Sequence, residues 1–307
     1  MKVLLTGAAG FVGSFVLNEL LILGHQVAIV LKPGTDSWRI HSLLNQCHII
    51  EQDLQTFQYS LEAIDAFAPE ALIHMAWYGV TNDKRNESAQ LKINIRILEQ
   101  LFEVVRASGI KTFIGLGSQA EYGPANYKIN ERQLTQPTTL YGVAKLAAYH
   151  WLKVMCQQHD IRFIWHRLFS AYGPKDHPSW FIPYLIKELM RGQIPALTKG
   201  TQLWDFVFVQ DAARAIVKTL ITKHASGVFN LGSGDPVRIR TVAETLAKNI
   251  NTELVLEFGK VPFRGDQVTH LEADISRLQE EVSWKPSVLL QDGLIQTIEW
   301  FRANKYA

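Results

Sequence analysis

The N-terminal half of the chain alternates short apolar runs with longer segments that carry apolar residues at helical spacing. Short apolar runs bounded by turn residues predict buried strands, and the periodic segments between them predict helices. The expected strands cover residues 3–5, 27–30, 48–50, 72–74, 113–116 and 162–165. The expected helices cover residues 15–23, 93–107 and 141–155. This alternation predicts an α/β fold of Rossmann type, a doubly wound parallel sheet with helices on both faces.

Beyond about residue 168 the alternation becomes irregular. A strand is expected at residues 206–208, and helices at 182–190, 212–221 and 294–301. The run Thr241-Val242-Ala243-Glu244 matches a capping box and predicts that another helix begins there. We therefore expect residues 1–167 to form the Rossmann domain. Residues 168–307 should form mainly a smaller C-terminal α+β domain, with some segments returning to the first.

Composition narrows the functional classes. The chain has 307 residues, of which 47% are hydrophobic and 20% charged, and a net charge of +2, typical of a soluble globular protein. We expect no nucleic-acid partner and no membrane association. Cys47 and Cys156 lie far apart without metal-ligand spacing, so we predict no metal and a cytoplasmic location. Gly7 interrupts the N-terminal apolar run too early for a signal peptide.

Three glycines stand between the first strand and the first helix. Gly7 allows a tight turn, Gly10 lets the backbone approach a pyrophosphate, and Gly13 lets helix and strand pack closely. Phe11 and Val12 then place free backbone N–H groups of the helix N-terminus at the phosphates. This loop predicts a dinucleotide site in residues 1–167.

Tyr141 and Lys145 lie four residues apart on a predicted helix and therefore share one face. A nearby ammonium favours the phenolate and lowers the pKa of a tyrosine, which is otherwise about 10. Such a pair is common by chance, so its weight depends on the glycine loop and on Ser118. Together they predict a tyrosine proton donor, a lysine that lowers its pKa, and a serine that polarises a carbonyl.

The Gly-x-x-Gly-x-x-Gly spacing resembles that of the extended short-chain dehydrogenase/reductase family, and the resemblance runs the length of the chain. The further segments that carry it are Asp53-Leu54, His74-Met75-Ala76, Asn94, Ser118 to Gly123, Tyr141 with Lys145, Arg167 to Pro174, Asp205 to Asp211, Arg264-Gly265-Asp266 and Trp284-Lys285-Pro286. The set is most similar to the branch that acts on nucleotide sugars: 4-epimerases, 4,6-dehydratases and 4-ketoreductases.

The resemblance implies site residues. It implies that Asp53 and Leu54 contact the adenine, that Ala76 lines the cofactor ribose, and that Asn94 and Phe169 also bind the cofactor. The residues that it assigns to the nucleotide-sugar substrate are Gln119, Ser170, Trp180 and Arg264, the last pairing with the diphosphate.

Departures from the family pattern narrow the reaction. Ser170 replaces a usual Asn, and Trp204 replaces an Arg. The 4,6-dehydratases carry an Asp-Glu pair where this chain has Gln119-Ala120. In GDP-fucose synthase a Cys and a His form the epimerising pair, and the matching residues here are Ala120 and Trp180. A 4-ketoreductase without epimerase activity at C3 or C5 remains.

The end of the second strand indicates the cofactor. NAD enzymes place a carboxylate there for the ribose hydroxyls, whereas this chain has Lys32, with Arg39 in support, which suits a 2′-phosphate. NADP(H) is therefore favoured and NAD(H) remains possible. We expect NADPH-dependent reduction of the C4 ketone of a nucleotide-linked 4-keto-6-deoxyhexose. The alternatives are an NAD-dependent 4-epimerase and, of another class, a non-catalytic dinucleotide-binding regulator. The resemblance also implies a homodimer formed by helices such as 93–107 and 141–155.

Overall fold

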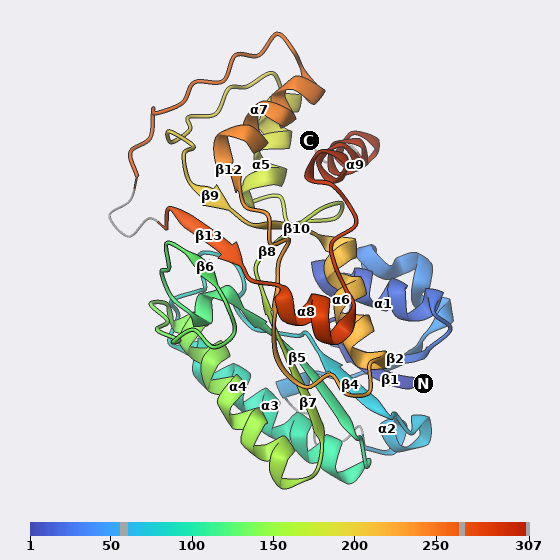
Figure 1. Cartoon of the computed structure of the whole chain (residues 1–307). Coiled ribbons are helices and arrows are strands. Elements are labelled where there is room, and N and C mark those ends of the chain that lie inside the picture. Colours follow the sequence, from blue (N-terminus) through green and yellow to red (C-terminus); the bar gives the residue numbers. More distant parts are fainter. Residues whose placement is uncertain (56–60, 264–267, 305–307) are drawn as a thin grey trace.

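The computed structural model describes residues 1–55, 61–263 and 268–304. Within them, seven strands form one parallel sheet in the order β11-β7-β5-β4-β1-β2-β3 (Figure 1). The strands are β1 (Lys2–Thr6), β2 (Gln26–Leu31), β3 (His48–Glu51), β4 (Ala71–His74), β5 (Thr112–Ser118), β7 (Arg162–Leu168) and β11 (Gly227–Leu231). The six predicted strands are all present, and the Rossmann-type fold is confirmed. The seventh strand, β11, was not predicted.

Helices cover both faces of this sheet. On one face pack α2 (Leu61–Phe67), α3 (Ala89–Ala107) and α4 (Leu140–Gln158), and on the other α1 (Phe11–Ile22), α6 (Val209–Ile221) and α8 (Ser276–Val282) (Figure 1). Side chains along a strand alternate between the faces, so Val3 and Leu5 join the core beneath α1 while Leu4 joins the core beneath α3. Both cores are apolar because both faces are covered.

A second group of helices lies at the carboxyl-terminal edge of the sheet. Here α5 (Phe181–Met190), α7 (Ile239–Ile250) and α9 (Leu290–Ala303) share a core that includes Leu185, Leu246 and Ile298. The shorter elements are η1 (Trp38–Gln46), η3 (Gln119–Glu121), β6 (Lys128–Ile129), β8 (Ser170–Tyr172), β9 (Leu203–Trp204), β10 (Phe206–Phe208), β12 (Val237–Arg238) and β13 (His270–Ala273). Strands β10 and β8 pair with each other, and β12, β9, β13 and β6 form a further small sheet.

The expected capping box at Thr241 is wrong. Helix α7 begins at Ile239, so Thr241 lies inside it, and no side chain caps the helix start. The backbone N–H groups of Ile239 and Arg240 donate instead to the carbonyls of Gln202 and Gly200. A neighbouring loop thus satisfies donors that a capping side chain would otherwise serve.

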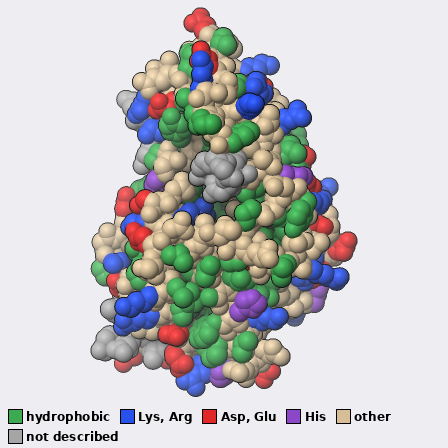
Figure 2. All heavy atoms as spheres, turned by 90° about the vertical axis from the view of Figure 1, so that its left-hand side faces the viewer, with side chains coloured by type: hydrophobic (Ala, Val, Ile, Leu, Met, Phe, Trp, Pro, Cys, Tyr) green, Lys and Arg blue, Asp and Glu red, His purple; other side chains and the backbone are tan. Residues whose placement is uncertain are grey.

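The face shown in Figure 2 carries acidic and basic side chains interspersed, and hydrophobic side chains gather on its lower half. Helices α3 and α4 expose hydrophobic residues, among them Leu91 of α3 and Val143 and Val154 of α4. Among the described helices, none combines the length and the apolar character that crossing a membrane requires.

Candidate active site

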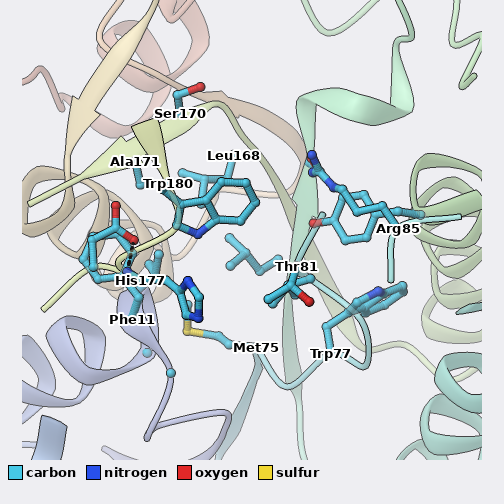
Figure 3. Close-up of a pocket in the computed structure, with 18 of the residues that line it drawn as sticks. Phe11, Met75, Trp77, Thr81, Arg85, Leu168, Ser170, Ala171, His177 and Trp180 are labelled. Carbon is cyan, nitrogen blue, oxygen red and sulfur yellow. Dashed lines mark hydrogen bonds between the residues drawn. The ribbon is translucent and has the colours of Figure 1, made fainter. Parts of the chain in front are cut away.

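A large cavity opens at the carboxyl ends of the central strands, and α5 contributes to its lining. Figure 3 shows some of the residues that line it. Its volume is about 1110 Å³, at the upper end of the range for small-molecule sites. The predicted site residues that line it are Gly7, Gly10, Phe11, Val12, Gly13, Lys32, Arg39, Asp53, Leu54, Ala76, Ser118, Gln119, Tyr141, Lys145, Phe169, Ser170 and Trp180. The topology therefore brings together residues from more than half of the chain. Arg264 lies outside the described residues.

The glycine loop is shaped by close backbone approaches. Gly7 has a φ of 77°, and a Cβ there would stand 2.5 Å from the backbone nitrogen of Ala76. A Cβ on Gly13 would stand 2.0 Å from the Gly7 carbonyl oxygen. Gly10 caps α1 without any side-chain hydrogen bond, so the first N–H groups of the helix face the cavity free of a capping side chain. This arrangement fits a pyrophosphate at a helix N-terminus.

The loop after β4 forms the neighbouring wall. Thr6 bonds the His74 ring at 2.7 Å and also accepts from the backbone N–H of Met75 and Ala76. Asn94 does not line the cavity, although we predicted that it binds cofactor. Its buried side chain accepts from the Tyr78 N–H and donates to the Tyr78 carbonyl. Asn94 therefore holds the wall in place from behind.

The three predicted catalytic residues meet in this cavity. Ser118 ends β5, whereas Tyr141 and Lys145 lie on the first two turns of α4, and all three side chains are buried. The Lys145 ammonium donates to the Leu116 carbonyl at 2.6 Å and sits 3.6 Å from the centre of the Trp77 ring. Tyr141 packs edge-on against the same indole.

The charge that acts most strongly on Tyr141 is not the predicted one. Burial raises the pKa of Tyr141, and the Arg85 guanidinium is the largest influence lowering that pKa, followed by a hydrogen bond from Ser118. Lys145 was expected to do this. Burial lowers the pKa of Lys145 itself to about 7, with the charge of Arg85 adding to that effect and Glu121 opposing it. An ammonium whose pKa is near 7 is only partly protonated at neutral pH. It is therefore a weaker source of positive charge than a guanidinium, which stays protonated.

Glu121 lies three residues after Ser118, and its side chain is fully engaged in structural contacts. Its carboxylate accepts from the Ser118 N–H, from the Trp165 indole at 3.0 Å and from Arg167 at 2.7 Å, and it has no exposed surface. This buried ion pair fixes the end of β5, and with it the Ser118 side chain.

The end of the cavity at which we expect the adenosine is lined by Lys32 and Arg39. The Lys32 ammonium forms an ion pair of 3.0 Å with Asp53 and keeps 61% of its side chain exposed. Arg39 donates to the carbonyl of Lys175, lies over the Trp38 ring, and so ties η1 to the segment after β8. Both cations line the cavity at the end of β2, where Asp53 already pairs with Lys32.

Ser170 and Trp204, the two residues that depart from the family pattern, lie together on the cavity wall at the end where we expect the sugar. The Trp204 indole donates to the Ser170 hydroxyl at 2.6 Å, so these two residues form one feature of the wall. In Figure 3, Phe11 and His177 lie on one side of the cavity, Arg85 and Trp77 lie on the other, and the Trp180 indole reaches in between. The Trp180 indole thus offers an apolar surface inside the cavity.

Sequence reasoning missed Trp77, Arg85, Asp176 and His177, which all line the cavity. Burial raises the pKa of Asp176 to about 8, against the effects of a hydrogen bond from the His177 N–H and of the Arg39 charge. The run His74-Met75-Ala76 could have indicated Trp77, because Trp77 is the next residue in the loop after β4, which forms a wall of the cavity. Arg85 follows a loop with no motif, and no local signal points to it.

Fold and site together define a dinucleotide-binding enzyme of the extended short-chain dehydrogenase/reductase type. The model of the NAD dependent epimerase/dehydratase family matches residues 3–232, and the chain belongs to this family. The chain is 26% identical to the CDP-abequose synthase of Salmonella muenchen, over 95% of both chains. It also resembles the UDP-glucose 4-epimerase of Thermotoga maritima, solved with UDP-glucose, with a TM-score of 0.89 and 25% identity over 99% of this chain and 100% of the other. Another similar structure is MoeE5 in complex with UDP-glucuronic acid and NAD, with a TM-score of 0.83 and 27% identity over 99% and 100% of the two chains.

Proposed function

We propose that this enzyme uses NADPH to reduce the C4 ketone of a nucleotide-diphosphate 4-keto-6-deoxyhexose, without epimerising C3 or C5. The observation that carries the proposal is the meeting of Ser118, Tyr141 and Lys145 beside the glycine cradle, in a cavity large enough for two nucleotides. The nucleotide-sugar substrate class is supported by the printed names of the relatives.

Each residue has a distinct task. Bound nicotinamide dinucleotide supplies the hydride. The Ser118 hydroxyl donates a hydrogen bond to the C4 oxygen and polarises the carbonyl. Tyr141 gives its phenolic proton to the same oxygen as negative charge develops there. Lys145 holds the ribose of the cofactor, while the Trp180 indole excludes water and so strengthens electrostatic interactions within the site.

The NADPH preference rests on the end of β2. Lys32 is the first charged residue after β2, and Asp36, which also lines the cavity, lies four residues further along. A lysine with most of its side chain exposed can turn from Asp53 toward a 2′-phosphate. A net reductase consumes NADPH, whereas an epimerase recycles its bound cofactor.

A 4-epimerase with bound NAD is the second candidate. Two observations favour it: the likeness to a UDP-glucose 4-epimerase, and the position of Asp53, whose carboxylate could accept hydrogen bonds from a ribose diol in place of Lys32.

One assay separates the two candidates. The purified enzyme is given CDP-, GDP- and dTDP-4-keto-6-deoxyglucose with NADPH or NADH, and separately UDP-glucose and UDP-glucuronate without added cofactor. Oxidation of NADPH by a keto sugar supports the reductase. Interconversion of C4 epimers without net cofactor turnover would replace it by the epimerase.

The absence of C3 and C5 epimerisation is tested in D₂O. Epimerising a carbon beside a ketone needs a base within hydrogen-bond reach of that carbon. Ala120 has no ionisable group, and the Trp180 indole is a donor only. We therefore expect no enzyme-dependent deuterium at C3 or C5 by NMR. Incorporation above an enzyme-free control would point to Asp176 or His177, two ionisable residues that also line the cavity.

We also propose a homodimer, from the exposed apolar residues of α3 and α4, and a cytoplasmic location, from the free cysteines. A homodimer would cover the exposed Leu91, Val143 and Val154 on α3 and α4. The two cysteines are free, which suits the reducing cytoplasm. Light scattering of the wild type and of Val154→Glu tests the dimer, which the variant should weaken.

A further inference from the structure

Arg85 is held against the catalytic tyrosine by two contacts. Its guanidinium lies 4.5 Å from the centre of the Tyr141 ring, and its backbone carbonyl accepts a hydrogen bond of 2.8 Å from the Tyr141 N–H. The same guanidinium lies 6.0 Å from the centre of the Trp180 ring. The loop between β4 and α3 therefore fixes a positive charge between the proton donor and Trp180.

No counter-ion neutralises this charge among the residues that the structure describes. Each ion pair found there joins other residues, and the buried Nε atom of Arg85 has no hydrogen-bond partner. Arginines that serve only structure usually pair with a carboxylate or with carbonyls when partly buried. Arg167, on β7, shows that pattern with Glu121. Arg85 instead faces the cavity.

We propose that Arg85 is a positioning residue that acts through Tyr141, stabilising the tyrosinate left when the phenol gives up its proton. The proposal rests on the proposed function only in naming Tyr141 as the proton donor. In the transfer the proton moves from the Tyr141 oxygen to the C4 oxygen, and the electron pair of the broken O–H bond remains on the tyrosine. The guanidinium then lies over an anionic ring. If the reaction runs in the oxidative direction, the same charge favours the tyrosinate that accepts the proton.

The other groups facing Tyr141 do not take this role. Lys145, on α4, turns its ammonium to the Leu116 carbonyl and the Trp77 ring, and its pKa is lowered to about 7 by burial. Glu121, on η3, raises the Tyr141 pKa and is itself paired with Arg167. Arginine alone keeps its charge across the working pH range.

The test measures ionisation of Tyr141 without substrate or cofactor. Tyrosinate absorbance in the near ultraviolet is titrated for the wild type, Arg85→Gln and Arg85→Lys, and the spectrum of the matching Tyr141→Phe chain is subtracted each time. We expect Arg85→Gln to raise the Tyr141 midpoint by on the order of one pH unit, and Arg85→Lys to raise it less. Arg106→Gln, which removes an exposed arginine paired with Glu103 on α3, is the control and should leave the midpoint unchanged.

Equal midpoints in the wild type and Arg85→Gln would overturn the proposal, and so would a rise in Arg85→Lys as large as in Arg85→Gln. Arg85→Lys keeps the cation and guards against misfolding of the glutamine variant, which thermal melts of all variants also monitor. A shifted midpoint in a chain that turns over none of the keto sugars would refute the proposed substrate and leave the role of Arg85 standing.

Discussion

The two ends of the cavity are built in different ways. At the end that we assign to the cofactor, the backbone makes the site, through three glycines within seven residues and the uncapped start of α1. At the sugar end side chains make it, and they come from separate loops and elements: Arg85, Ser118, Tyr141 and Trp180. A site made by backbone depends on local spacing and tolerates little change. A site made by side chains depends on tertiary contacts and can be altered one group at a time.

Tyr141→Phe should show the largest difference between the two ends of the cavity, because it should affect turnover and not cofactor binding. The change removes one hydroxyl that acts only on the reacting oxygen, so we expect kcat to fall by about 10³-fold or more while cofactor affinity stays nearly unchanged. Turnover is measured with a keto sugar identified by the panel above, and cofactor binding by fluorescence titration. Activity within a few-fold of the wild type would show that another group supplies the proton.

Gly13→Ala is the opposite change, confined to the cofactor end. The added Cβ would overlap the Gly7 carbonyl oxygen at 2.0 Å, and because neither atom can move without its backbone, helix and loop must separate. We expect cofactor affinity to fall by roughly 10-fold or more. Gly24→Ala is the control, since nothing lies within 4 Å of its Cβ. Its φ of 74° makes the control cost about 1 kcal/mol of stability without altering affinity. Equal affinities in the two variants would show that the loop does not hold the cofactor.

The difference between features set by local sequence and features set by tertiary contacts also decided what the sequence could predict. The apolar runs specified six strands of the sheet, because buried parallel strands read as continuous apolar segments. The segment of β11 reads Gly-Val-Phe-Asn-Leu and lies between turn-like residues, so its place beside β7 came only from tertiary pairing. The glycines were found by spacing. Arg85 was not, because its position depends on how the loop after β4 folds against α4, which no local pattern records.

Asp176 lines the cavity and lies next to a residue that contacts Arg39, and its effect can be measured as a change in stability with pH. Its neighbour Lys175 bonds Arg39 at the cofactor end, while Asp176 itself lines the cavity. Burial raises the pKa of Asp176 from 3.8 to about 8, so the folded protein holds the proton over a range where the unfolded chain has lost it. The stability contributed by the protonated form is full below about pH 4 and is lost as pH rises through 8.

Asp176→Asn imitates the protonated carboxyl at every pH. The melting temperatures of variant and wild type should therefore agree near pH 4, and the variant should gain several degrees by pH 8. Melting curves at a series of pH values give the comparison, with Asp235→Asn as the exposed control. A constant difference between variant and wild type at all pH values would mean that the Asp176 pKa is the same in the folded and the unfolded chain.

Lys32→Asp gives the smallest expected effect and bears on whether the cofactor end is made by backbone alone. The substitution removes the candidate partner of a 2′-phosphate and supplies a carboxylate that repels it and suits a ribose diol. We expect the ratio of kcat/KM for NADPH over NADH to fall about 10-fold, which corresponds to about 1.4 kcal/mol. Asp53→Asn works in the opposite direction, because it frees Lys32 from its ion pair and should raise the ratio. If neither substitution changes the ratio, Lys32 does not read the 2′-position. If the wild type prefers NADH, the carboxylate of Asp53 rather than the ammonium of Lys32 defines this end, and the epimerase becomes the better assignment.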